Sequence, residues 1–227
     1  MKANRYGYYL LDKELPEPVN HLPRPSDKVG CAYICHPKKK PNPNESMNYT
    51  ETNIPGVWIL EPKVFHDARG YFMEAYKQAE WESFLGSTHF IQDNESCSSR
   101  GVLRGMHYQL APYAQAKLVR VIVGTVLDVA VDIRRGSPTF GQYVMAELSA
   151  ENHRQFYIPR GFAHGFFVKS ETAIFTYKVD NSYMPSHERG FRFDDPAVDI
   201  QWGIEEMTSV LTSDKDRVLP LLRDAEI

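Results

Sequence analysis

The stretch Gly101-Val-Leu-Arg-Gly-Met-His-Tyr-Gln109 decides how this chain is organised. Its apolar and aromatic residues predict a strand, and within it Arg104 and His107 stand three positions apart. Because residues two apart share a face of a strand, this odd spacing puts the two side chains on opposite faces unless the strand bulges at Gly105. Two interpretations follow: a bulge that directs both side chains into one cavity, or an Arg and a His on a solvated sheet surface.

Short apolar runs separated by turn residues continue on both sides of this stretch. They predict strands over residues 57–60, 64–65, 70–76, 90–94, 102–109, 117–123, 125–133, 142–148, 155–158, 164–168 and 172–179. Helix-forming residues at 78–85, closed by Gly86, predict one short helix, and we expect a helix or two near the C-terminus. So many short strands in one chain favour an all-β sandwich or barrel.

Composition and charge narrow the class of protein. The 227 residues carry a formal net charge of -3, and since both signs are spread along the chain, nothing indicates a nucleic-acid or membrane surface. No apolar run reaches the roughly 20 residues of a membrane span, and the N-terminus lacks a signal-peptide layout. Cys31, Cys35 and Cys97 are expected to be unpaired thiols rather than part of a metal site. We therefore expect a cytoplasmic protein.

Residues 1–50 differ in character from the rest of the chain. Proline recurs through them, a basic cluster stands at 38–40, and hydrophobic periodicity is weak. Such a segment cannot bury enough apolar surface to offset the entropy lost on ordering. We predict a flexible Pro-rich tail at 1–50 and one domain at 51–227, with Met47 as an alternative start of the functional chain.

Two kinds of active site find little support. His107 and His164 lack the His-x-His spacing and the evident carboxylate of a metal-binding cupin, so a catalytic metal is disfavoured. The sequence has no Gly-x-Ser-x-Gly elbow and no phosphate-binding glycine loop, and nothing in it activates Cys97.

The predicted strands instead carry polar residues that a barrel can direct inward. This set comprises Arg69, Glu74, Gln92, Asn94, Arg104, His107, Lys117, His164 and Tyr177. Barrel interiors normally fill with apolar side chains, so together these residues predict a pocket for an anionic ligand, and two arginines with a lysine suit a diphosphate. For each residue alone, solvent exposure is the competing interpretation, and the ring of Tyr177 is equally consistent with the core.

From about Gly56 to the C-terminus the sequence resembles the dTDP-4-dehydrorhamnose 3,5-epimerase family. The motifs that carry the resemblance lie at 60–65, 67–70, 92–94, 102–109, 117–120, 128–134, 137–141, 148–152, 158–165 and 177–178. The family implies an all-β fold, a double-stranded β-helix (cupin-like jelly-roll) barrel with a few short helices. It also implies a homodimer that acts on a dTDP-sugar without metal or cofactor. Ala116 departs from the family, which usually has Gly before the matching lysine.

The resemblance also implies roles for the matching residues. His107 matches the general base, Asp216 its carboxylate partner with Asp214 as the competing choice, and Tyr177 the general acid. Lys117 and Arg104 match positive groups beside the sugar carbonyl. The other matches are substrate-binding positions: Arg69, Glu74, Gln92, Asn94, His164, Glu188 and Lys215, with Tyr183 beside the nucleotide base.

These roles predict an isomerase of dTDP-rhamnose biosynthesis. It would invert C3 and C5 of dTDP-4-dehydro-6-deoxy-D-glucose, giving dTDP-4-dehydro-L-rhamnose, because the 4-keto group acidifies the protons on both neighbouring carbons. The alternatives are a single-centre epimerase of a related dTDP-4-keto-deoxysugar, a non-catalytic sugar-nucleotide binding barrel, and a metal-dependent cupin. The presence of a candidate base, its carboxylate partner and an acid disfavours the non-catalytic barrel.

Overall fold

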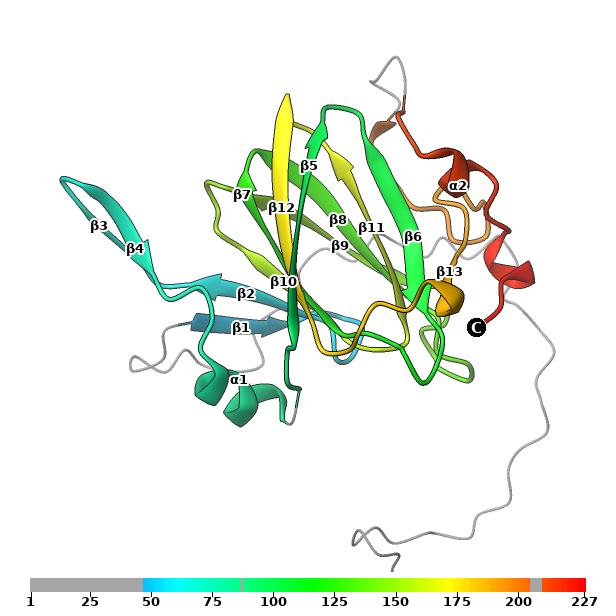
Figure 1. Ribbon diagram of the computed structural model, residues 1–227, viewed down its shortest axis with the longest axis horizontal. Helices are drawn as coiled ribbons and strands as arrows, with labels where there is room; N and C mark the ends of the chain where they lie inside the picture. The colour runs from blue at the N-terminus through cyan, green and yellow to red at the C-terminus, as the bar shows by residue number, and fades with distance from the viewer. Residues whose placement is uncertain (1–46, 87, 205–209) are drawn as a thin grey trace, which may run out of the picture.

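The computed structural model describes residues 47–86, 88–204 and 210–227, and in these ranges the chain consists mainly of antiparallel strands (Figure 1). One sheet has six strands, in the order β1 (Met47–Glu51), β2 (Trp58–Pro62), β10 (Gln155–Ile158), β7 (Lys117–Val123), β12 (Thr172–Val179) and β5 (Gln92–Ser99). A second sheet has five, in the order β13 (Glu188–Gly190), β6 (Leu103–Gln109), β11 (Phe162–Val168), β8 (Thr125–Asp132) and β9 (Tyr143–Ser149).

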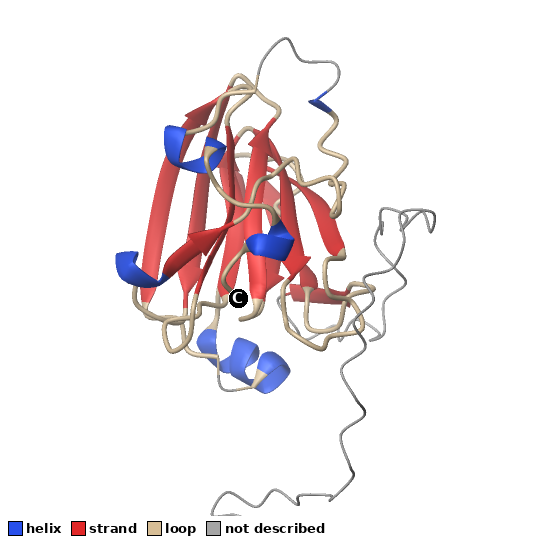
Figure 2. Cartoon of the chain, turned by 90° about the vertical axis from the view of Figure 1, so that its right-hand side faces the viewer, coloured by secondary structure: helices blue, strands red, loops and turns tan. Residues whose placement is uncertain are grey.

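The remaining elements are short. They are the hairpin strands β3 (Val64–Asp67) and β4 (Gly70–Met73), the helices α1 (Gln78–Leu85) and α2 (Asp214–Arg217), and the 3-10 turns η1 (Pro185–His187) and η3 (Leu222–Asp224). The hairpin projects away from both sheets (Figure 1), and the helices lie at the edges of the molecule (Figure 2). None of the described helices is long and apolar enough to cross a membrane.

The two sheets face each other across a shared apolar core. Val119 and Phe175 point inward from the six-stranded sheet, and Val126 and Phe166 point inward from the five-stranded one. Each of these four side chains belongs to a residue that is at most 5% exposed. Because successive strand residues alternate between faces, one face of each sheet supplies this core while the other remains available for a second layer. The sandwich of short strands predicted from the sequence is therefore confirmed.

The C-terminal segment covers the outer face of the five-stranded sheet. Val129 and Val131 point to that face and are buried in one cluster with Phe191, Trp202 and Leu222. Burial of apolar surface of this kind contributes roughly 25 cal/mol per Å². It holds the end of the chain against β6, so that α2 contacts this strand although more than a hundred residues separate them in sequence.

Strand β6 contains a bulge, one of the two alternatives that the spacing of Arg104 and His107 left open. Between Arg104 and His107 its register against β11 shifts by one residue, so three steps along β6 stand opposite two steps along β11. Gly105 lies within this irregularity with a φ of 130°, and a Cβ there would lie 2.6 Å from the Cα of Gly165. Only glycine satisfies both conditions. As a result Arg104 and His107 line the same cavity, which confirms the first of the two interpretations.

Some boundaries differ from those predicted. Residues 47–50, which their composition placed in the tail, form most of β1, because Met47 and Tyr49 alternate toward a buried face and pair with β2. The short strand β13 was not predicted, since three residues carry no periodicity. Residues 1–46, and with them Cys31, Cys35 and the rest of the predicted tail, lie outside the described residues.

Candidate active site

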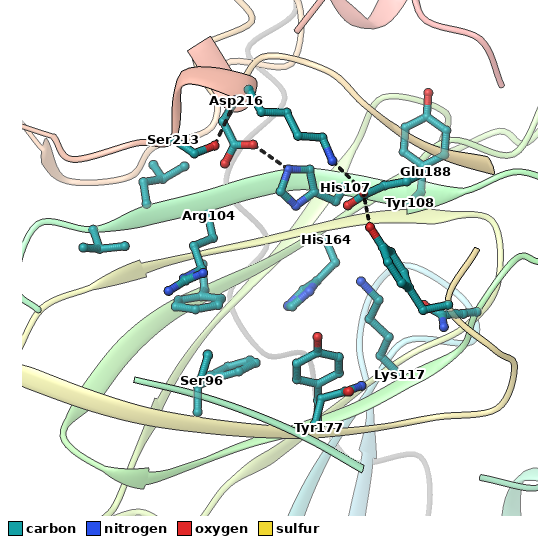
Figure 3. A pocket seen from close by; sticks show the side chains of 18 of the residues that line it. Ser96, Arg104, His107, Tyr108, Lys117, His164, Tyr177, Glu188, Ser213 and Asp216 are labelled. Atoms are coloured by element: carbon teal, nitrogen blue, oxygen red, sulfur yellow. Dashed lines mark hydrogen bonds and ion pairs between the residues drawn. The ribbon is translucent and has the colours of Figure 1, made fainter. Parts of the chain in front are cut away.

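A cavity of about 670 Å³ opens between the two sheets beside the C-terminal segment (Figure 3). Strands of both sheets and the residues around α2 supply its walls. Most of the predicted site residues line it: Gln92, Asn94, Arg104, His107, Lys117, His164, Tyr177, Tyr183, Glu188, Lys215 and Asp216. Polar residues from distant parts of the sequence therefore converge on one space, as the resemblance implied.

On one wall, His107 of β6 pairs with Asp216 of α2. Its Nε2 lies 2.7 Å from Oδ1 of Asp216, whose side chain is only 4% exposed. The other carboxylate oxygen accepts a hydrogen bond from the Gly105 N–H at 3.4 Å, and Ser213 caps the helix by accepting from the Asp216 N–H. Asp214 is fully exposed on the same helix. The structure thus places Asp216, and not Asp214, against the imidazole.

The surroundings of Asp216 prepare His107 to accept a proton. Burial alone would raise the pKa of the carboxyl, but the hydrogen bond and charge of His107, with the Gly105 N–H, outweigh it and lower the pKa. The ionised carboxylate accepts the Nε2 proton of His107 and leaves Nδ1 bare. Figure 3 shows this second ring nitrogen turned toward the cavity. A bare imidazole nitrogen in that position can remove a proton from a bound carbon acid.

On the opposite wall, Tyr177 of β12 and Lys117 of β7 extend from the six-stranded sheet (Figure 3). Burial raises the pKa of the Tyr177 phenol, Arg104 lowers it and Glu188 raises it, with a net increase, so the hydroxyl keeps its proton at neutral pH. Burial lowers the pKa of Lys117 to about 8, while Asp128 and Glu188 act to raise it. The cavity therefore offers a base and an acid on opposite walls, with a cation beside the acid.

A second His–Asp pair lies deeper in the cavity. Nε2 of His164 stands 2.9 and 3.0 Å from the two carboxylate oxygens of Asp128, which is 0% exposed. The imidazole stacks against the ring of Phe175, with centroids 6.1 Å apart. Sequence reasoning assigned Asp128 no role, although an acidic residue between Val126 and Ala130, on the inward face of a strand, was the available signal. In the described ranges, no group of three His, Cys, Asp or Glu side chains gathers closely enough to hold a metal ion.

At the rim of the cavity, Glu188 connects two further predicted residues. Its Oε2 accepts hydrogen bonds from the Tyr183 hydroxyl at 2.7 Å and from the Lys215 ammonium at 2.5 Å. Burial would raise the pKa of Glu188, but the bonds from Lys215 and Tyr183 lower it overall. Tyr183 itself is 51% exposed, so its ring stands at the opening, where a planar base can stack.

Two predicted site residues, Arg69 and Glu74, lie outside this cavity. Arg69 occupies the turn of the β3–β4 hairpin, where its side chain is 90% exposed and paired with Asp67. Glu74 follows β4 and borders a separate hollow with Arg120 and Thr176 of the six-stranded sheet. Because the hairpin projects from the sheets, Arg69 lies apart from the other predicted residues of its own chain (Figure 1), whereas Glu74 shares its hollow with Asn94 and Tyr177.

The proteins that this chain resembles are sugar epimerases, and they include a 3'-monoepimerase from Streptomyces bikiniensis that is 33% identical, with a TM-score of 0.71 over 75% of this chain and 86% of that chain. The family model described as "dTDP-4-dehydrorhamnose 3,5-epimerase" matches residues 51–224. A curated protein of that name from Shigella flexneri is 55% identical over 171 residues, which cover 75% of this chain and 93% of that one. A crystal structure of the enzyme from Elizabethkingia anophelis is 49% identical, with a TM-score of 0.76 over 79% of this chain and 98% of that chain.

A third relative was solved with a sugar nucleotide. It is the epimerase from Legionella pneumophila in complex with dTDP-4-keto-L-rhamnose, 49% identical, with a TM-score of 0.75 over 78% of this chain and 93% of that chain. These matches confirm the cupin-like jelly-roll fold expected from the resemblance. A family model spanning most of the chain, relatives at about half identity and a matching fold together place this chain in the dTDP-4-dehydrorhamnose 3,5-epimerase family.

Proposed function

We propose that this chain inverts C3 and C5 of dTDP-4-dehydro-6-deoxy-D-glucose and so produces dTDP-4-dehydro-L-rhamnose for dTDP-rhamnose biosynthesis. The observation that carries this function is the placement of a His107–Asp216 pair on one wall of the cavity, with the protonated Tyr177 on the other. Inversion at carbon needs a base on one face of the substrate and an acid on the other, and the two walls meet that requirement.

His107 begins each inversion by taking a proton from a carbon next to the 4-keto group. Electrons of the broken C–H bond move into the carbonyl and form an enolate, while Asp216 stabilises the resulting imidazolium through its 2.7 Å contact with Nε2. The ammonium of Lys117 stabilises the enolate oxygen. Removing one such preorganised donor costs on the order of 3 kcal/mol of barrier. Tyr177 then donates its proton from the opposite face, and the centre is inverted; proton exchange with solvent restores neutral His107 and the Tyr177 hydroxyl before the second centre reacts.

Rim residues hold the nucleotide part of the substrate. Lys215 supplies positive charge for the diphosphate, and Gln92 and Asn94, two positions apart on β5, supply amides. Tyr183 stacks on the base. The chemistry needs no cofactor, because the 4-keto group of the substrate is itself the electron acceptor for both proton removals.

We further propose a homodimer in which the projecting hairpin of one subunit reaches the cavity of the other. The hairpin exposes Phe65 and Phe72, which pair across its two strands, and Tyr71 on its other face; each is more than half exposed, and large apolar side chains exposed in this way indicate a protein contact. It also carries Arg69, and Glu74 directly follows it. Pairing of two chains would bring both residues to the site at which the resemblance implied them.

The defining experiment is proton NMR of dTDP-4-dehydro-6-deoxy-D-glucose with the enzyme in deuterated water. We expect deuterium to enter at both C3 and C5, and the product to be accepted by a reductase that forms dTDP-L-rhamnose. Exchange at only one carbon would instead identify a single-centre epimerase. Tight dTDP binding without any exchange would leave a non-catalytic binding barrel.

The acid is tested separately with Tyr177→Phe. Because the base and its carboxylate are untouched, this variant should still exchange protons from the carbons flanking the keto group, whereas inversion should be lost. Full epimerisation by Tyr177→Phe would remove Tyr177 from the role of acid.

A further inference from the structure

We propose that Asp128 is a positioning residue of this active site: its buried carboxylate holds the Nε2 proton of His164, leaves Nδ1 as an acceptor for a sugar hydroxyl, and keeps Lys117 positively charged. This role rests on the proposed function and deepens it, since Asp128 would set the protonation states of His164 and Lys117, two groups that contact the substrate. Asp128 itself does not line the cavity and acts only through these neighbours.

A carboxylate at this position is unexpected on structural grounds alone. Asp128 lies on the inward face of β8, between Val126 and Ala130, and both neighbours belong to the core between the sheets. An ionised carboxylate in apolar surroundings is strongly destabilising unless it is paired and hydrogen-bonded. A Val or Ala would pack there without that penalty. We infer that this charge serves the cavity rather than the core, through His164, which it contacts, and Lys117, whose charged form it favours.

The geometry defines the state of His164. Asp128 stands diagonally across from it on the neighbouring strand, and both carboxylate oxygens lie within 3.0 Å of the same ring nitrogen, Nε2. A carboxylate at that distance accepts a proton, so Nε2 carries it and Nδ1 does not. Phe175 stacks on the ring and restrains its orientation. His164 thus offers the cavity a neutral acceptor, suited to a substrate hydroxyl rather than to a phosphate.

The same carboxylate acts on Lys117. The side chain of Lys117 lies in the cavity with Glu188 of β13, His164 of β11, His107 of β6 and Tyr177 of β12, and the charge of the buried Asp128 of β8 also acts on it. Asp128 and Glu188 favour its charged form, whereas burial opposes it and lowers its pKa to about 8. Loss of Asp128 would remove the stronger of the two negative charges that favour protonated Lys117, so the lysine would lose its proton nearer to neutral pH.

Asp128→Asn tests this role, with Asp132→Asn as the matched control. Asp132 is an equally buried aspartate on the same strand, but it accepts hydrogen bonds from Arg134, Ser137 and Thr139 and does not line the cavity. We expect Asp128→Asn to raise KM and to move the alkaline decline of kcat to lower pH by about one unit or more. Asp132→Asn should lose stability but keep the wild-type pH profile. An unshifted profile in folded Asp128→Asn, or an equal shift in both variants, would overturn the role.

A second measurement stands even where Asp128→Asn fails to fold. Two-dimensional ¹H–¹⁵N NMR of the wild-type histidine ring, assigned with His164→Gln, reports which nitrogen carries the proton. We expect it on Nε2 across neutral pH, and a proton on Nδ1 would mean that Asp128 is a neutral acid and that the role is wrong. Because this measurement needs no turnover, it tests the role of Asp128 independently of the proposed function. A protein without epimerase activity would refute the proposed function, and the NMR spectrum would still show which nitrogen of His164 carries the proton.

Discussion

Two His–Asp pairs share one cavity, and their surroundings differ. His107 is 26% exposed at the side chain and takes its carboxylate from the C-terminal helix, whereas His164 is 9% exposed and takes its carboxylate from the adjacent strand. In the first pair hydrogen bonds lower the pKa of Asp216 despite its burial; in the second, burial dominates and raises the pKa of Asp128. The same two side chains thus serve different chemistry: in the first pair the carboxylate supports a ring that must become charged, and in the second it holds the proton of a ring that stays neutral.

The largest difference between the pairs is expected on replacing the histidines. His107→Asn removes the base and should lower kcat by up to about 10⁴-fold, the upper end of the roughly 10²- to 10⁴-fold range of a general base, while dTDP affinity stays near that of the wild type. His164→Asn leaves the base in place but removes a hydroxyl contact and the imidazole partner of Asp128, so it should act mainly on KM and on stability. Steady-state kinetics with calorimetric titration of dTDP would separate these outcomes. Near-normal turnover by His107→Asn would show that His107 is not the base.

A smaller loss is expected on neutralising the first carboxylate. Asp216→Asn leaves the imidazolium of His107 without its counter-charge and should reduce kcat by about 10²-fold. Asp214→Asn is the control, because this side chain lies two residues away on the same helix and is fully exposed. Its kcat should equal that of the wild type. Equal losses in both variants would show that the helix, rather than the contact with His107, matters.

The next largest effect is expected on replacing Gly105, in the backbone between the two His–Asp pairs. Gly105 donates to Asp216, and a Cβ there would meet the Cα of Gly165 at 2.6 Å and the carbonyl oxygen of His164 at 2.8 Å. Gly105→Ala should therefore cost about 2–4 kcal/mol in the free energy of unfolding and reduce activity as well. Gly136→Ala, also at positive φ but with nothing within 4 Å of the added Cβ, should cost only about 1 kcal/mol and leave activity intact. Urea denaturation of the two variants provides the comparison.

The smallest effect is a pH dependence. Protonated Lys117 is the active form, and its pKa is lowered to about 8, so kcat should fall as pH rises through this value. At pH 9 about a tenth of the lysine remains charged, which predicts a roughly tenfold loss. Tyr177, whose pKa is raised, remains protonated over this range. Lys117→Arg should move the decline to higher pH, and an unchanged profile in that variant would assign the titration to another group.

Much of the fold followed from local patterns. The helix at 78–85 with Gly86 at its end, and the strands at 117–123, 155–158 and 172–179, have the predicted boundaries, because periodicity and turn residues act within a few positions of one another. The odd spacing of Arg104 and His107 left two interpretations open, and the register confirms the one with a bulge. Strands β1 and β13 were missed where the local signal was short or lay beside a Pro-rich segment.

The candidate site likewise has a part that follows from the sequence and a part that does not. Its residue types and their order along the chain were determined by the sequence by itself, since acid–base and charge chemistry belong to side chains. Which of them meet was decided only by the tertiary structure. The C-terminal cover brings Asp216 rather than Asp214 to His107, the projecting hairpin keeps Arg69 out of the cavity of its own chain, and strand pairing sets Asp128 against His164. These contacts depend on how sheets pack across long sequence separations, and no short-range pattern encodes such distances.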